Sequence, residues 1–196
     1  FKNFAIISGD MRLSKDSGEI VNDTYSKVFK VNKNVLVGFT GSGNAVDVLN
    51  KNGIFDKDDC PSAEDFLEFL WLLLGNRVVN EPNHCNILVF GKSKMNYGFG
   101  GNFHMSEDDV QNQLHLTDHR NVWSPILTPP DVDYEYYQDL VNSKVQFIIA
   151  EQIISPVFSR GIAIKKIKEV HREIILEISK KDRSVNSNIE QHVIKW

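Results

Sequence analysis

The segment FAIISGDMR at residues 4–12 is followed by YSKVFKVN at 25–32 and by NVLVGFTGSGNAVDVL at 34–49. The first apolar run is too short for a helix and stops at Gly9-Asp10, which predicts a buried strand that ends in a turn. The Val- and Leu-rich run after Asn34 predicts another strand, joined to an alternating strand before it by a hairpin turn. Three strands, a Gly-rich turn and a short helix therefore open the chain.

Lys27 lies within the alternating strand. With a period of two, it shares a face with two aromatic residues and a valine, whereas Val28 and Lys30 lie on the opposite, wetter face. A lysine on a covered face needs an acidic partner or loses its proton, because burying an unpaired ammonium group is costly. Asp10 is the nearest acidic candidate if the two strands are neighbours. The alternative is that Lys27 extends past its neighbours into water.

Gly41-Ser42-Gly43 interrupts the strand just before the helix expected around Ala45 to Leu49. A Gly-rich turn of this kind exposes backbone N–H groups at a helix N-terminus, where they can hold an oxyanion. The same Gly-Ser-Gly sequence is also typical of a simple tight turn. Gly41 is therefore a candidate oxyanion donor, and Lys27 with Asp10 a candidate charged pair.

Three motifs together resemble the proteasome β-subunit family and its bacterial relative, the HslV-type peptidase. They are Asp10-Met11-Arg12, Lys27-Val28-Phe29-Lys30 and Gly38-Phe39-Thr40-Gly41-Ser42, in the family's order and at similar spacing. The resemblance covers about the first quarter of the 196 residues. It implies an α+β fold: a four-layer αββα sandwich of two mainly antiparallel sheets, formed by one N-terminal-nucleophile hydrolase domain over residues 1–196.

The resemblance also implies a mechanism. In this family the side chain of the first residue, usually Thr, attacks the scissile carbonyl, and its own α-amine acts as general base. By this match Lys27 keeps the amine neutral, Asp10 holds the lysine, and Gly41 donates its N–H to the oxyanion. The implied reaction is hydrolysis of peptide or amide bonds, with no cofactor and no metal.

Phe1 departs from the family pattern, because it has no hydroxyl or thiol with which to attack. The family also places a further strand before the run that corresponds to Phe4–Ser8. Loss of that strand would leave an unpaired edge inside the sandwich, so we expect strand and nucleophile upstream of Phe1; a protein that has lost both is the alternative. The family's second-half serine and aspartate have no counterpart near Gly98–Gly101, and no catalytic residue is assigned there.

The composition of the chain limits the kinds of partner that it could bind. A chain of 22.4 kDa fits one domain with a sizeable core. A formal net charge of -4 argues against nucleic acid or an anionic membrane as a partner. No run is long enough to span a bilayer, no signal peptide is visible at the start given, and Cys60 and Cys85 lack paired metal-type spacing. These features predict a cytoplasmic protein.

Periodicity predicts the remaining elements. Ser62 caps a helix with Asp65 as its capping partner. Partly alternating isoleucines after Gly161 predict a return to strands. The expected elements are a helix at 62–78, strands at 85–92 and 94–100, a helix at 132–154, strands within 161–179 and a last strand at 189–196.

Residues 104–128 show no regular periodicity, and the histidines among them suggest a possible metal site. His115 and His119 would face one way on a helix and could bind zinc, yet no third ligand is specified, and exposed loop or short strands is the simpler interpretation. Asn83-His84-Cys85 leads straight into an apolar strand, which favours structural residues over a Cys/His site. No metal ligand is therefore assigned.

Two functions fit these observations. The first is a proteasome-like hydrolase with its nucleophile ahead of Phe1, and the second is a non-catalytic structural or interaction subunit of the same fold. Both imply self-association as a ring or dimer. Tyr134, Tyr136 and Tyr137, early in the long helix, suit a subunit contact or core packing equally. A third hypothesis, an α+β binding domain, would gain if Asp10 and Lys27 lay far apart.

Overall fold

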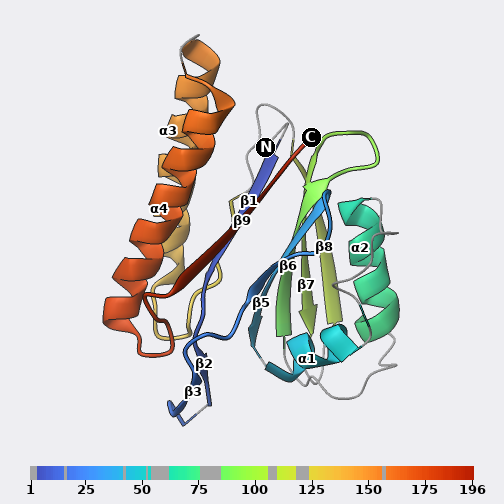
Figure 1. The fold of residues 1–196 in the computed structure, drawn as a ribbon, viewed down its shortest axis with the longest axis vertical. Coiled ribbons are helices and arrows are strands. Elements are labelled where there is room, and N and C mark those ends of the chain that lie inside the picture. The colour runs from blue at the N-terminus through green and yellow to red at the C-terminus, as the bar shows by residue number, and fades with distance from the viewer. Residues whose placement is uncertain are drawn as a thin grey trace. The chain divides into compact units, whose positions relative to one another are not determined.

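The computed structural model describes residues 4–15, 17–41, 43–51, 53, 62–75, 85–105, 110–117, 124–155 and 158–196. The chain has a mixed α/β fold with antiparallel sheets, and it divides into two compact units built from non-contiguous segments. The first unit takes in residues 1–7, 27–121 and 192–196, and the second takes in residues 8–26 and 122–191 (Figure 1).

A five-stranded antiparallel sheet forms the centre of the first unit, and each strand pairs with its neighbour in the sequence. Its strands are β4 (Val28–Lys30), β5 (Val35–Gly41), β6 (Cys85–Lys92), β7 (Gly98–Met105) and β8 (Val110–Thr117). The predicted turn before β5 is confirmed, because the Asn32 side chain accepts the Asn34 N–H at 2.7 Å. The prediction of strand 94–100 is shifted, since β7 begins at Gly98 and continues into the stretch we expected to be irregular.

Two helices belong to this unit, α1 (Gly43–Lys51) and α2 (Ala63–Leu70), and a π-helical turn (η2, Trp71–Gly75) follows α2. The predicted cap is confirmed: the Ser62 hydroxyl accepts the Asp65 N–H at 3.2 Å and donates to the Asp65 carboxylate at 2.6 Å. α2 lies against β5, β6 and β7 and buries Phe66, Leu67 and Leu70 there. The end of the predicted helix, at Val78, lies outside the described residues.

The two terminal strands, β1 (Phe4–Asp10) and β9 (Ile189–Lys195), pair with each other in a two-stranded sheet. Within the first unit their buried side chains form a cluster with the five-stranded sheet, made of Ala5, Ile7, Val28, Leu36 and Ile194. Val28 is only 3% exposed, so its predicted place on a wet face is wrong, whereas Lys30 on the same face is exposed. The cluster covers the middle of that face and leaves its end to solvent.

A helical hairpin of α3 (Tyr134–Ile154) and α4 (Arg160–Lys181) forms most of the second unit (Figure 1). α3 matches the predicted long helix to within two residues. The prediction of strands within 161–179 is wrong, because this segment is the interior of α4. The buried residues recur every third or fourth position, which is the helical period: Ala163, Ile164, Ile167, Val170, Ile174 and Ile178. β-branched isoleucines had suggested a strand, but packing on α3 decides the outcome.

A short antiparallel pair follows β1, made of β2 (Leu13–Ser14) and β3 (Ile20–Asn22). Gly18 turns this hairpin with a φ of 80°, a left-handed conformation that glycine adopts without strain. Among the described helices, none is both long and apolar enough to cross a membrane.

Candidate functional site

The three residues of the predicted site are distributed over both units. Lys27 and Gly41 belong to the first unit, and Asp10 belongs to the second, so neither unit by itself holds all three. Their local surroundings can be described one by one. The ion pair expected between Asp10 and Lys27 stays a prediction.

Gly41 ends β5 immediately before the segment that leads into α1. Its φ is 99°, within the left-handed region that L side chains rarely adopt. The sequence pattern Gly-Ser-Gly therefore marks a real change of chain direction from strand to helix. Gly41 is also exposed, so its backbone can be approached from solvent.

Lys27 lies beside the side of β5 that faces β4, the side to which the Gly41 N–H also points. The Lys27 carbonyl accepts the Phe39 N–H at 2.8 Å, which extends the β4–β5 pairing by one residue beyond Val28. Successive N–H groups in a strand point to alternate edges, so the N–H of Gly41 points to the same edge as that of Phe39. In the described pairing of β4 with β5, residues 28–30 lie opposite residues 36–38. Gly41 therefore lies beyond the paired segment of β5.

The face on which Lys27 lies follows from its strand neighbours. Phe29 and Phe39 contact each other edge to face, with ring centroids 5.6 Å apart, so alternate positions along both strands share this face. Lys27, two residues before Phe29, is half-buried. The sharing of a face by Lys27 and Phe29 stays a prediction, and Lys27 is not fully covered.

Cys85 pairs with Gly41 across β5 and β6. Its thiol is fully buried, and desolvation raises its pKa to about 12. A thiol with so high a pKa is not ionised near neutral pH, and burial keeps it from substrate. Cys85 is therefore a structural core residue, as predicted, and offers no nucleophile beside Gly41.

Asp10 makes a tight local turn at the end of β1. Its carboxylate accepts the backbone N–H of Arg12 at 2.9 Å, an Asx-type turn that fixes the Asp-x-Arg motif. Asp10 is half-buried.

Arg12 joins distant segments of the second unit. Its guanidinium group bonds the Asp23 carboxylate at 2.5 Å and the Arg183 carbonyl at 2.8 Å. The hydrogen bond from Arg12 is the main reason why the pKa of Asp23 lies below its usual value. The Arg12 side chain is 18% exposed, and the clamp joins the turn at the end of β1, the end of β3 and the loop after α4.

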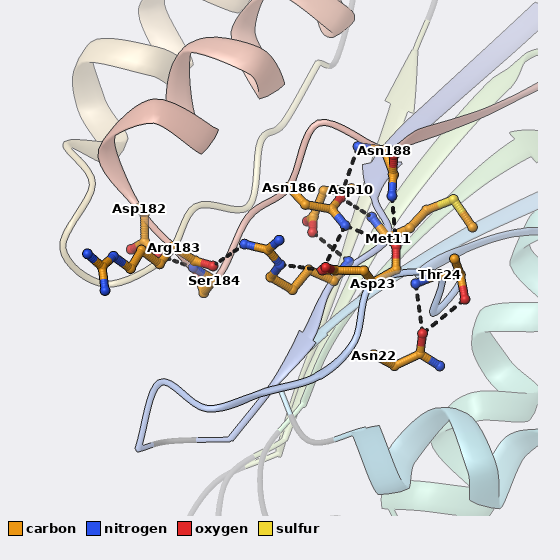
Figure 2. Close-up of polar contacts among 11 residues, drawn as sticks. Asp10, Met11, Asn22, Asp23, Thr24, Asp182, Arg183, Ser184, Asn186 and Asn188 are labelled. Atoms are coloured by element: carbon orange, nitrogen blue, oxygen red, sulfur yellow. Dashed lines mark hydrogen bonds and ion pairs between the residues drawn. The ribbon is translucent and has the colours of Figure 1, made fainter.

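Asn186 is the buried centre of the same network and is 6% exposed. Its side-chain oxygen accepts the N–H groups of Met11 and Asn188, each at 3.1 Å, and its amide donates to the Asp23 carbonyl at 3.0 Å (Figure 2). The sequence analysis assigned no role to this stretch. A signal was present in the repeat Asn186-Ser187-Asn188, because asparagine side chains often bond nearby backbone groups in turns.

Ser8, His171 and Gln191 form a second polar cluster that the sequence did not suggest. The Ser8 hydroxyl lies 2.9 Å from His171 Nδ1 and accepts a hydrogen bond from Gln191 at 3.0 Å. Desolvation lowers the pKa of His171 to about 4, so the ring is neutral near pH 7 and can accept the Ser8 proton. Gln191 also donates to the Lys168 carbonyl at 2.9 Å, which ties β9 to α4.

An open groove of about 320 Å³ lies on the second unit beside this cluster. It is lined by Gly161, Ile164, Lys165, Lys168, Glu169, Arg172 and Gln191. Three cations against one carboxylate give the groove a positive lining. No Ser, Cys or Thr lines it, so the groove offers a surface for an anion but no nucleophile.

No cluster of metal-binding side chains occurs among the described residues. The helical spacing imagined for His115 and His119 does not apply, because His115 lies in strand β8; His119 and His84 lie outside the described residues. His104, on β7, has its Nδ1 2.7 Å from the Asn86 side chain on the adjacent strand.

Comparison with solved structures gives a weak likeness of fold. No protein-family model and no curated protein matches the chain. A crystal structure of eukaryotic HslV from Trypanosoma brucei aligns with 98% of this chain and with 94% of its own, at 13% sequence identity and a TM-score of 0.48.

Proposed function

We propose that this chain is a proteasome-like N-terminal-nucleophile hydrolase of peptide or amide bonds, with its nucleophile supplied by a residue ahead of Phe1. The observation that carries the proposal is the register of β4 on β5, which sets Lys27 opposite Phe39, two residues before Gly41. A cation and an N–H donor close to one another are what acyl transfer by a terminal amine requires. The three sequence motifs that resemble the proteasome β-subunit family also support the proposal.

In this proposal each residue has one task. The Lys27 ammonium keeps the terminal amine neutral by its positive potential, so that the amine can take the nucleophile's proton. Asp10 holds Lys27 through its carboxylate, which also accepts the Arg12 N–H of the turn. Gly41 presents its N–H to the developing oxyanion, and its left-handed φ turns the following chain away from the substrate.

The proposal includes an arrangement and an assembly. The two units would form one domain, a four-layer αββα sandwich, in which Asp10 and Lys27 come within ion-pair distance. The protein would act in the cytoplasm and self-associate as a ring or dimer.

A non-catalytic subunit of the same fold is the second candidate, and one observation favours it. Gly98–Gly101, where the family's glycine-rich catalytic element would lie, are buried residues of β7 paired on both sides with β6 and β8. Backbone groups held in a ladder are not free to orient a nucleophile. Such a subunit would assemble without turning over substrate.

The test is hydrolysis of a panel of fluorogenic peptide amides by the naturally processed protein and three variants. Lys27→Ala and Asp10→Asn should each lower kcat on the order of 100-fold, since they remove the charge that tunes the base. Asn at position 10 can still accept the Arg12 N–H, so the turn is retained. Lys30→Ala, which removes an exposed lysine from the same strand, is the matched control and should leave kcat unchanged.

Unchanged turnover in Lys27→Ala or Asp10→Asn would refute the assigned roles. Absence of turnover in the naturally processed protein on every peptide of the panel, together with an intact assembly, would favour the non-catalytic subunit instead.

A further inference from the structure

Three cationic side chains of α4 line the open groove of the second unit. Lys165, Lys168 and Arg172 follow one another at intervals of three and four residues, so they project from one side of the helix. Lys165 and Arg172 are exposed, and Lys168 is half-buried. Among the described residues none of the three forms an ion pair, although Lys166 of the same helix pairs with Glu151 at 2.8 Å. The described carboxylates therefore leave this positive charge without a direct partner.

The carboxylates nearest to the groove do not neutralise its lining. Glu169 lines the groove, but it forms no ion pair within the described part of the chain. Glu173, one turn further along α4, pairs with Lys144 of α3 at 3.0 Å, and Glu190 on β9 accepts the Ser26 hydroxyl. Three cations against the single carboxylate of Glu169 leave two positive charges on the lining. The lining therefore favours an anion that carries about two negative charges.

Hydrogen bonds hold one wall of the groove in place. Gln191 donates through its side-chain amide to the Ser8 hydroxyl at 3.0 Å and to the Lys168 carbonyl at 2.9 Å. An amide nitrogen has two protons, so both are used within the fold and recognition of an anion is left to the cations. These bonds tie β9 to the turn of α4 that carries Lys168. A wall that is already ordered costs less conformational entropy when a ligand binds.

The size and lining of the groove indicate a ligand larger than a bare ion. Its volume is about 320 Å³, which is near the lower end of the range for small-molecule sites. Gly161 and Ile164 add apolar surface next to the cations. Within the described residues, a Cβ at position 161 would contact only the Ser159 hydroxyl, at 3.7 Å, so the space beside this glycine is open. A small organic group that carries the anion fits such a lining.

We propose that this groove binds a small phosphate monoester through its phosphoryl group. A phosphate monoester carries about 1.5 to 2 negative charges at pH 7, which matches the lining, whereas a single carboxylate carries one. The planar guanidinium of Arg172 can donate to two phosphoryl oxygens, and Lys165 and Lys168 add compact positive charges. The organic group of the ester lies over Gly161 and Ile164. This binding goes beyond the proposed function and requires no catalysis.

Calorimetric titration with three anions tests the proposal and distinguishes the source of the phosphoryl group. Phenyl phosphate supplies a phosphoryl and an apolar group, inorganic phosphate supplies the first alone, and succinate is a dianion without a phosphoryl group. Phenyl phosphate should bind roughly tenfold more tightly than inorganic phosphate, because its ring also covers the apolar lining. Succinate should bind more weakly than either.

Substitutions in the groove test whether the anion binds there. Arg172→Gln and Lys168→Gln should each weaken the binding of phenyl phosphate about tenfold or more, since each removes a charge-assisted hydrogen bond. Lys180→Gln is the matched control, because it removes an exposed lysine of the same helix that does not line the groove, and it should leave the affinity unchanged. Phenyl phosphate should also raise the Tm of the wild-type protein more than that of Arg172→Gln.

Absence of phenyl phosphate binding at concentrations up to about 10 mM overturns the proposal. Unchanged affinity in both groove variants also overturns it, because the anion would then bind elsewhere. Equal affinities for phenyl phosphate and inorganic phosphate would contradict the choice of an ester. Succinate binding as tight as that of phenyl phosphate would contradict the choice of a phosphoryl group. None of these measurements involves hydrolysis, so failure of this proposal and failure of the proposed function are distinguishable.

Discussion

The carbonyl of Lys27 accepts the N–H of Phe39 at 2.8 Å, one residue beyond the last regular pair of β4 and β5. This single bond registers Lys27 against β5 and leaves the Gly41 N–H two residues further along the same edge. The chemistry that we propose depends on this juxtaposition.

Replacement of Gly41 by alanine tests the backbone at this edge. Because φ is 99° there, an alanine should strain the strand-to-helix turn by about 1–2 kcal/mol and displace the amide that we assign to the oxyanion. We expect a lower Tm and a kcat reduced on the order of 100-fold. Gly18→Ala, with a φ of 80° in the β2–β3 connection, is the control and should lower Tm but not kcat. Equal kcat values for the two variants would contradict the oxyanion role.

The Arg12–Asp23 ion pair should be visible in the titration of Asp23. In the wild-type protein the hydrogen bond from Arg12 lowers the pKa of the Asp23 carboxyl, and Arg12→Ala should return it towards its ordinary value. A lowered folded-state pKa contributes stability that is present above the unfolded pKa and is lost as pH falls through the folded one. NMR titration of Asp23 in both proteins measures the change. An identical pKa in the two would show that the pair does not persist in solution.

Removal of the Asn186 side chain should destabilise the turn that carries the Asp-x-Arg motif. Asn186→Ala leaves the Asn188 N–H without its acceptor and removes one acceptor from Met11, which we expect to cost roughly 1–3 kcal/mol in the free energy of unfolding. Asn188→Ala removes an exposed side chain from the same loop and should change that free energy by about 0.5 kcal/mol or less. Urea denaturation of both variants distinguishes them, and equal losses would contradict the central role of Asn186.

His171 should make stability depend on pH in a defined window. Its folded pKa of about 4 lies below the ordinary value of 6.5, so the unfolded chain takes up a proton first as pH falls. Stability should be complete above the unfolded pKa and fall between about pH 6.5 and pH 4, by at most roughly 3 kcal/mol. His171→Asn keeps an acceptor for the Ser8 hydroxyl and should flatten this part of the profile. A wild-type profile that is already flat there would contradict the burial of the ring.

Sequence periodicity predicted most of the first unit, because the patterns that specify its elements each lie within a few consecutive residues. Strands β5 and β6, the turn at Asn32 and the Ser62 cap each depend on residues within a few positions of one another. The same reasoning failed at α4. Isoleucines there satisfy a partial alternation as well as the helical period, and only the facing side chains of α3 decide between the two.

The polar networks of the second unit could not be predicted from the sequence. Ser8 and His171 are 163 positions apart, as are Asn186 and Asp23, and no local pattern links such residues. Asp10, Lys27 and Gly41 became candidates through strand alternation and the Gly-rich turn, and the family motifs assigned each of them a role. Even so, the motif did not reveal that the arginine of Asp-x-Arg clamps the loop after α4.

The most direct test of the central claim is intact mass with N-terminal sequencing of the natively expressed, processed protein. Our account predicts a mature chain that begins with Thr, Ser or Cys, roughly one strand of 5–6 residues ahead of the run that starts at Phe4. A mature chain that begins with any other residue would contradict it, since no terminal hydroxyl or thiol would then be available to attack a carbonyl.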